Sequence, residues 1–164
     1  MSVVLSTGYA ARSMLGGESF VDLFRDGVIE LRGGPQPQSA DAAVSNATTP
    51  LLGRITRDGL NWTPGAPTGG LRWFAADRFV IKEPSHRWVI KATGTGTVTW
   101  MRLLPNAGDD NLASQTAPRI IGGVGLIDSE DDAQLWLPTV LFTPTTEIEV
   151  QHFWFAIPPI PTGD

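Results

Sequence analysis

Cysteine is absent from this 164-residue chain. Without it the protein can have no disulfide framework, no thiol nucleophile and no zinc site built on thiolates. Clustered basic charge is lacking as well, because the arginines stand singly between aliphatic residues and the formal net charge is −5. Nucleic-acid binding requires a basic surface that displaces counterions from phosphates, so the sequence argues against a nucleic-acid partner.

Long apolar runs are also missing. The apolar residues 3–5 form a run too short for the hydrophobic region of a signal peptide. No stretch approaches the ~18 apolar residues that a membrane-spanning helix needs. We therefore expect a chain made in the cytoplasm, without a membrane partner; if it reaches an extracellular place, it does so by assembly or lysis.

The residues that are present favour one ordered domain over positions 1–164. A chain of this length can bury roughly two-thirds of its unfolded surface. Six tryptophans and seven phenylalanines supply large side chains for the core. The 18 glycines and 13 prolines, set between recurring apolar clusters, indicate many turns joining short ordered segments.

One helix is predicted, over residues 19–26. Ser19 can cap its first turn, Asp22 occupies the capping-box position, and Gly27 is expected to end it. Apolar residues recur at i, i+3 and i+4 within it, namely Phe20, Leu23 and Phe24. A weaker helical turn is expected over residues 40–44.

The remainder of the chain predicts short strands separated by clusters of Gly, Pro, Asn or Asp. The expected strands are 28–32, 51–57, 71–74, 79–82, 87–92, 98–104, 134–137, 140–142 and 147–157. Gly94-Thr95-Gly96 has the spacing of a hairpin turn between two of them. This pattern favours an all-β fold, an antiparallel β-sandwich or jelly roll with one short N-terminal helix.

Two extended arms are expected, at residues 1–17 and 157–164. The second arm contains three prolines within residues 157–161, which cannot donate hydrogen bonds to a β-ladder. The first arm has no helical or strand period of its own, so its apolar residues need a partner surface. We therefore expect subunit contacts at Leu5, Tyr9, Ile157, Pro158, Pro159 and Ile160. The alternative is that both arms fold back onto their own sheet.

Few residues are candidates for catalysis or metal binding. Glu147 and Glu149 share a strand face about 7 Å apart, a separation compatible with a glycosidase pair, although a solvated strand face is far commoner. The acidic run 128–132 lacks the glycine and the later glutamate of an EF-hand loop. His152 is expected in a core or interface and His86 in a solvated turn. We predict no catalytic residue, no metal and no cofactor.

The six tryptophans could include a platform on which a sugar ring stacks. Five of them lie in expected strands, where packing into the core is favoured. Trp62 lies in a turn and is the one that we expect to be exposed. The run Gly122-Gly123-Val124-Gly125 lacks the lysine and the following helix of a phosphate-binding loop.

Several stretches form a loose pattern over most of the chain. They are LSTGY at 5–9, a short helix at 20–24, GVIELRGGPQP at 27–37, SADAA at 39–43, LLGRIT at 51–56, GLRW at 70–73, TVTWMR at 97–102 and PRI at 118–120. This pattern resembles a group of small virion proteins of tailed bacteriophages and prophages. Members of the group often carry an aromatic residue where this chain has Leu31 or Met101. The resemblance implies a virion component and carries no catalytic residues.

These observations lead to the hypothesis of a non-enzymatic virion protein, a capsid decoration (cement) protein that binds the major capsid protein or other virion proteins. We expect a symmetric homo-oligomer, a trimer, because local three-fold axes occur on icosahedral shells and closed symmetry hides apolar surface. A head spike, a neck or collar protein and a tail-tip protein are alternatives within the same class. A carbohydrate-binding module for host adhesion is an alternative of another class, and a hydrolase using Glu147 and Glu149 is the third.

Overall fold

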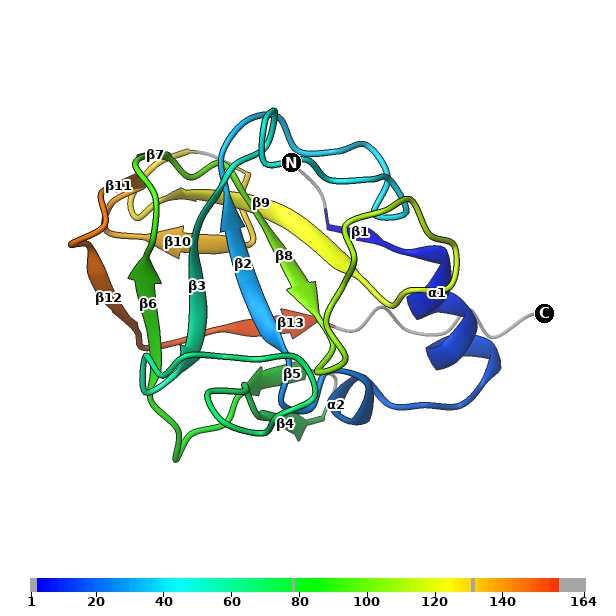
Figure 1. Cartoon of the computed structure of the whole chain (residues 1–164). Coiled ribbons are helices and arrows are strands. Elements are labelled where there is room, and N and C mark those ends of the chain that lie inside the picture. Colours follow the sequence, from blue (N-terminus) through cyan, green and yellow to red (C-terminus); the bar gives the residue numbers. More distant parts are fainter. Residues whose placement is uncertain (1–2, 78, 131, 157–164) are drawn as a thin grey trace.

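The computed structural model describes residues 3–77, 79–130 and 132–156. Strands make up 35% of the structure and helices 9%, with a large antiparallel sheet and a short helix near the N-terminus. The predicted all-β fold is therefore confirmed. Figure 1 shows α1 and α2 at one end of the molecule and β11 and β12 at the other.

One large sheet forms the centre of the fold. From edge to edge its strands are β1 (Val4–Leu5), β9 (Ile120–Leu126), β8 (Trp100–Leu104), β2 (Val28–Arg32), β3 (Leu51–Arg57), β6 (Trp88–Ala92) and β12 (Glu147–Val150). These neighbours all pair antiparallel. A further strand, β10 (Leu135–Leu137), pairs parallel with β9.

Two small sheets complete the sandwich-like arrangement. One contains β4 (Trp73–Ala76), β5 (Phe79–Lys82) and β13 (Trp154–Ala156), and the other contains β7 (Gly96–Thr97) and β11 (Leu141–Phe142). Both small sheets contribute buried side chains, such as Val80 and Phe142, to the cluster that also contains Ile29 and Leu31 of the large sheet. The main core therefore lies between the large sheet and the two small ones.

The central strand β2 is buried on both faces. Because side chains alternate across a strand, Ile29 and Leu31 face the main core, whereas Glu30 and Arg32 face the opposite side. On that side the sheet is covered by the loops 33–50 and 105–119. A small second cluster, made by Ala40, Trp100 and Ile121, packs there beneath the loops.

The predicted helix is present as α2 (Phe20–Leu23), a single turn. The Ser19 hydroxyl oxygen accepts a hydrogen bond from the Asp22 N–H at 3.1 Å, as the capping pattern predicts. The left-handed position after the helix belongs to Asp26, with φ 57°, and not to Gly27. Gly27 is needed for a different reason, because a Cβ there would collide with the Leu104 carbonyl oxygen.

The segment 3–17 is not the extended arm that the sequence predicts. Strand β1 pairs with β9, and the chain then forms α1 (Thr7–Ala10) and a π-helical turn, η1 (Ala11–Leu15). Ser6 caps α1, since its hydroxyl oxygen accepts a hydrogen bond from the Tyr9 N–H at 3.0 Å. The helical segment is too short for a 3.6-residue apolar period to be visible in the sequence.

The predicted hairpin at Gly94-Thr95-Gly96 is wrong. Strand β6 pairs with β3 and β12, whereas β8 pairs with β2 and β9, so the chain crosses over two strands between them. The predicted last strand, 147–157, is also divided between two sheets, as β12 and β13. The segment expected as a helical turn at 40–44 contains only a turn, with an Ala42 N–H to Ser39 carbonyl bond of 3.2 Å.

Strand β9 was not predicted, because its sequence IIGGVGL reads as a glycine-rich loop. The strand nevertheless occupies the sheet between β8 on one side and β1 and β10 on the other. Its glycines admit close neighbours: a Cβ on Gly122 would lie 3.0 Å from Oε1 of Gln134. That oxygen accepts a hydrogen bond of 2.7 Å from the Gly123 N–H.

Candidate functional site

The outer face of the three-stranded sheet β4-β5-β13 carries exposed aromatic side chains. Phe74 pairs with Ile81, and Ile81 pairs with Trp154, so the three side chains lie in one row across the sheet. Phe79 lies two residues before Ile81 on the same face. Its ring meets the Trp154 ring edge to face, with centroids 5.5 Å apart. We call these four residues the aromatic face.

The aromatic face is open to solvent. Phe74 is 50% exposed, Phe79 43% and Trp154 59%. The opposite face of the same sheet is anchored in the core, where the Trp73 ring meets the Trp88 ring edge to face at 4.8 Å and Val80 is buried. The sheet is therefore held firmly from one side while its aromatic residues project from the other.

The second unusual feature is a group of buried charges on the outer face of the large sheet. Its members are Glu30 and Arg32 on β2, Arg102 on β8, and Asp109 and Arg119, which we call the charge network. The register places Glu30 opposite Arg102. The Glu30 carboxylate accepts hydrogen bonds from Nε of Arg32 at 2.9 Å and from Nη2 of Arg102 at 2.8 Å.

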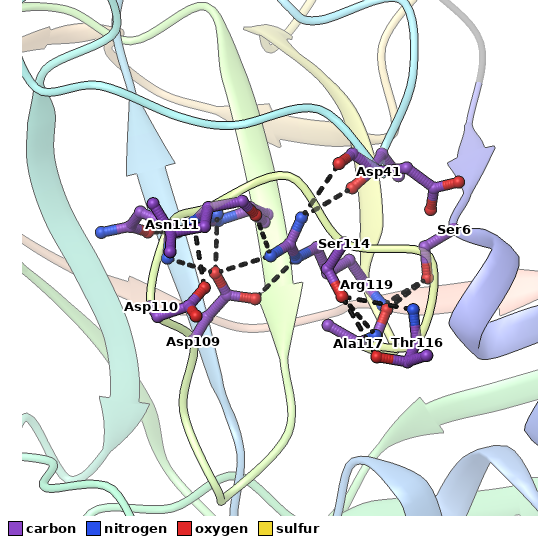
Figure 2. A network of polar contacts seen from close by, with 12 residues as sticks. Ser6, Asp41, Asp109, Asp110, Asn111, Ser114, Thr116, Ala117 and Arg119 are labelled. Atoms are coloured by element: carbon purple, nitrogen blue, oxygen red, sulfur yellow. Dashed lines mark hydrogen bonds and ion pairs between the residues drawn. The ribbon is translucent and has the colours of Figure 1, made fainter.

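Arg119 forms the other half of the charge network (Figure 2). Its Nε and Nη2 atoms donate to the two carboxylate oxygens of Asp109 at 2.6 and 3.0 Å, and both side chains are 1% exposed. Its backbone N–H donates to the Ser6 hydroxyl oxygen at 2.8 Å. Arg102 links the two halves through an ion pair with Asp109 at 3.5 Å. Figure 2 shows Arg119 lying between Asp109 and Ser6.

The charge network contains three guanidinium groups and two carboxylates. Two of the guanidinium groups also donate hydrogen bonds to carbonyl oxygens of the covering loops, Arg32 to Thr49 at 2.8 Å and Arg119 to Leu112 at 2.7 Å. These carbonyl oxygens partly compensate the excess positive charge of the network. Burial by itself would raise the pKa of Glu30, but the attraction of Arg102 and Arg32 and their hydrogen bonds outweigh it and hold that pKa below its usual value.

The geometry indicates that the charge network stabilises the fold. Every member binds either another member or the loops 33–50 and 105–119, so the network attaches these loops to the sheet. The sequence offered one signal for it, because Glu30 and Arg32 alternate with apolar residues in a strand. Nothing in the sequence indicated that loops would cover this face.

The residues that the sequence offered as candidates for catalysis or metal binding do not form a common site. Glu147 and Glu149 lie exposed on the edge strand β12, and Glu149 accepts a hydrogen bond from Nε of Arg87 at 3.1 Å. His152 is exposed between β12 and β13 and not in the core, because the predicted last strand is interrupted there; an interface position stays a prediction. Among the described residues, no group of three or more His, Asp or Glu side chains could hold a metal ion.

A shallow pocket of about 290 Å³ lies beside α2. Its lining includes His86, which is half-buried, and two arginines, Arg25 and Arg72. Both arginines already form ion pairs, Arg25 with Asp22 at 3.0 Å and Arg72 with Asp26 at 2.6 Å. The pocket therefore offers little free positive charge to an anionic ligand.

The tryptophans are distributed differently from the prediction. Trp62 is half-buried, and its indole N–H donates to the Asp26 carbonyl at 2.9 Å. The strongly exposed tryptophans among the described residues are Trp154 and Trp136, the latter 40% exposed on β10. Both lie in strands, where alternation brings one side chain in two to the surface.

The predicted subunit contacts have different outcomes. Leu5 is 39% exposed, so a contact there remains a prediction. Tyr9 is buried in the chain's own core, stacked on Phe24 with centroids 5.8 Å apart, and is not available to a partner. The other four predicted contacts, Ile157, Pro158, Pro159 and Ile160, lie outside the described residues.

Comparison with known proteins identifies no relative. No family profile, curated protein or solved structure matches the chain. Within the described segments, no helix is both long and apolar enough to cross a membrane.

Proposed function

We propose that the protein is a non-enzymatic structural component of a tailed-phage particle, a decoration protein that binds the outer surface of the capsid. The observation that carries the proposal is the aromatic face, a contiguous apolar surface on a firmly anchored sheet. The resemblance of several sequence stretches to small virion proteins suggests that the partner is a phage particle.

The chemistry of the aromatic face is that of a protein-binding surface. Exposed apolar patches on soluble domains mark interaction sites, and aromatic residues are enriched at the centres of protein interfaces. Strands β4 and β13 are the two edges of their sheet, so each also presents backbone groups on one side. A partner can therefore gain apolar burial and backbone hydrogen bonds at the same place.

A trimer placed on the local three-fold axes of the shell would present three aromatic faces at once. Several moderate contacts then act together, because the second and third bind at a high effective concentration. The partner that we propose is the major capsid protein or another virion protein at the same surface.

The number of copies in purified particles tests this proposal. A decoration protein is expected in hundreds of copies, measured by gel band intensity against the major capsid protein. A dozen copies or fewer would contradict decoration and would favour a position in a head spike, neck, collar or tail tip. Absence from particles would contradict a virion role altogether.

A carbohydrate-binding module is the second candidate, favoured by the exposure of Trp154 and Trp136. The geometry of the aromatic face is less suited to it, because the Phe79 and Trp154 ring planes meet at 84° and do not form a flat platform. A glycan array distinguishes the two functions. Glycan binding by the purified protein that is lost in Trp154→Ala or Trp136→Ala would favour the carbohydrate-binding module.

A further inference from the structure

We infer that Arg54 and Lys91 form a binding site for a carboxylate on an acidic segment of a partner protein. The site lies on the outer face of the large sheet, where β3 and β6 are neighbours (Figure 1). It goes beyond the proposed function and does not depend on it, because the main core separates this face from the aromatic face. A molecule bound through its aromatic face keeps the site open to solution.

The register of four strands places charged residues in one row across the sheet. Arg54 of β3 pairs with Glu30 of β2 on one side and with Lys91 of β6 on the other. Lys91 in turn pairs with Glu147 of β12. Directly opposite residues share a face, with Cβ atoms about 5 Å apart, and like charges in these positions are destabilising. The pair of cations at the centre of the row therefore costs stability unless an anion lies beside it.

Neither cation is closely bound to a carboxylate. Lys91 is exposed, and its Nζ atom has no hydrogen bond or ion pair with any residue that the structure describes. Arg54 is 41% exposed and forms an ion pair with Oε1 of Glu30 at 3.6 Å. Four other exposed arginines lie closer to their carboxylates, at 2.6 to 3.1 Å, namely Arg12, Arg25, Arg72 and Arg87. An open position for a negative charge therefore remains beside Arg54 and Lys91, on the part of the face that the covering loops do not close.

The turn after β3 holds the Lys91 side chain in position. Gly59 in this turn has φ 66°, and a Cβ there would lie 2.8 Å from Cε of Lys91 and 3.4 Å from its Nζ atom. The lysine stem therefore lies directly against the backbone of the turn. The turn is itself bound next to β6, since the Asp58 N–H donates to the Arg87 carbonyl oxygen at 2.8 Å. A lysine held in this way loses less side-chain entropy when it binds an anion.

The balance of charge favours a carboxylate as the ligand. The exposed part of the row contains two cations, Arg54 and Lys91, and one anion, Glu147, so one positive charge is in excess. A carboxylate brings one negative charge, and its two oxygens can accept hydrogen bonds from both cations. A phosphate monoester, with a charge of about −1.5 to −2, exceeds the excess. A nucleic acid would need a wider basic surface than two side chains provide.

The experiment titrates the purified full chain with a blocked hexapeptide of alternating glutamate and glycine, at low ionic strength, and follows the backbone amide signals by NMR. The signals of Arg54 and Lys91 are expected to shift with the peptide and not with a matched peptide that has glutamine in place of glutamate. Lys91→Gln should weaken binding about threefold, the effect of losing one exposed ion pair. Arg12→Gln, which removes an exposed cation on η1, should bind the peptide as the unchanged chain does.

A second variant makes a prediction of opposite sign. Glu147→Gln removes the carboxylate that lies opposite Lys91 in the register and competes with the ligand for it. Binding of the glutamate peptide should therefore become about twofold tighter. A residue with only a structural role in the sheet edge would not produce this increase.

Equal binding of the two peptides would overturn the inference. So would unchanged binding in Lys91→Gln, or binding in Glu147→Gln that is no tighter than in the unchanged chain. Inorganic phosphate that binds more tightly than the glutamate peptide would contradict the choice of a carboxylate. Circular dichroism checks that each variant is folded. Because Lys91 and Glu147 are both exposed, either variant decides the question if the other does not fold.

Discussion

The outer faces of the large sheet and of the sheet β4-β5-β13 are opposite in character. The large sheet has charged residues on its outer face, and these are buried: Arg102 and Arg119 are each 1% exposed. The three-stranded sheet has aromatic residues on its outer face, and these are open to solvent. Charged side chains are normally exposed and aromatic ones buried, so both faces need an explanation.

The explanation differs between the two faces. The charged face is closed by the chain's own loops, and every carboxylate in the charge network accepts hydrogen bonds from guanidinium groups. The aromatic face is closed by nothing in the described chain, which is why we assign binding to it. On this proposal stability and binding occupy separate surfaces, and we expect that each can be changed without the other.

The largest effect is expected where the charged face is broken. Arg119→Ala leaves the buried Asp109 carboxylate with the more distant Arg102 as its only charged partner among the described residues, and removing one partner of a buried ion pair typically costs ~3–5 kcal/mol. Urea unfolding monitored by tryptophan fluorescence measures this loss. Arg25→Ala, which removes an exposed ion pair with Asp22, should leave the unfolding midpoint nearly unchanged. A loss below ~1 kcal/mol in Arg119→Ala would contradict the assignment of the charge network to stability.

A smaller effect, which depends on pH, is expected at Glu30. The folded protein holds the pKa of Glu30 below its ordinary value, so its stabilising contribution is complete above that ordinary value and is lost as the pH falls through the folded-state pKa. Glu30→Gln should unfold more easily at pH 7, by about 1–3 kcal/mol, because a neutral amide replaces a paired charge.

Acid titration of the unfolding free energy checks the sign of this effect. The unchanged protein should lose more stability than Glu30→Gln as the pH falls below about 5, since glutamine does not titrate. Parallel pH profiles for the two proteins would show that Glu30 contributes no pH-dependent stability.

The smallest effect is expected at the pair of glutamates on β12. The double change Glu147→Gln and Glu149→Gln removes one exposed ion pair with Arg87, and it should alter the unfolding free energy by less than about 1 kcal/mol. Incorporation into particles, measured on purified virions, should also be unchanged. If the unchanged protein has hydrolytic activity and this variant loses it, the non-enzymatic assignment is wrong.

The strands that are bounded by clear turn residues could be predicted from the sequence. Strands β2, β3 and β5 have the predicted bounds, because each is a short run of β-forming residues between turns. Strand β9 could not be predicted in this way, since three glycines among seven residues favour a loop. The interruption of 147–157 was also hidden, because no glycine or proline marks the break between β12 and β13.

The candidate site was predicted less completely than the fold. Both faces of the sheet β4-β5-β13 are apolar, so alternation alone does not indicate that Trp73 is buried and Phe74 exposed. The burial of Arg102 depends on loops 33–50 and 105–119, which have no periodic pattern. Contacts between residues far apart in the chain decide both cases, and one sequence does not contain them.

Incorporation of an aromatic-face variant into particles tests the central claim most directly. The double variant Phe79→Ala and Trp154→Ala should keep the unfolding free energy within ~0.5 kcal/mol of the unchanged protein, because both side chains are exposed. Purified particles assembled with it should carry less than a tenth of the normal number of copies, while Trp136→Ala should be incorporated normally. Normal incorporation of the folded double variant would contradict the claim that the aromatic face is the binding surface.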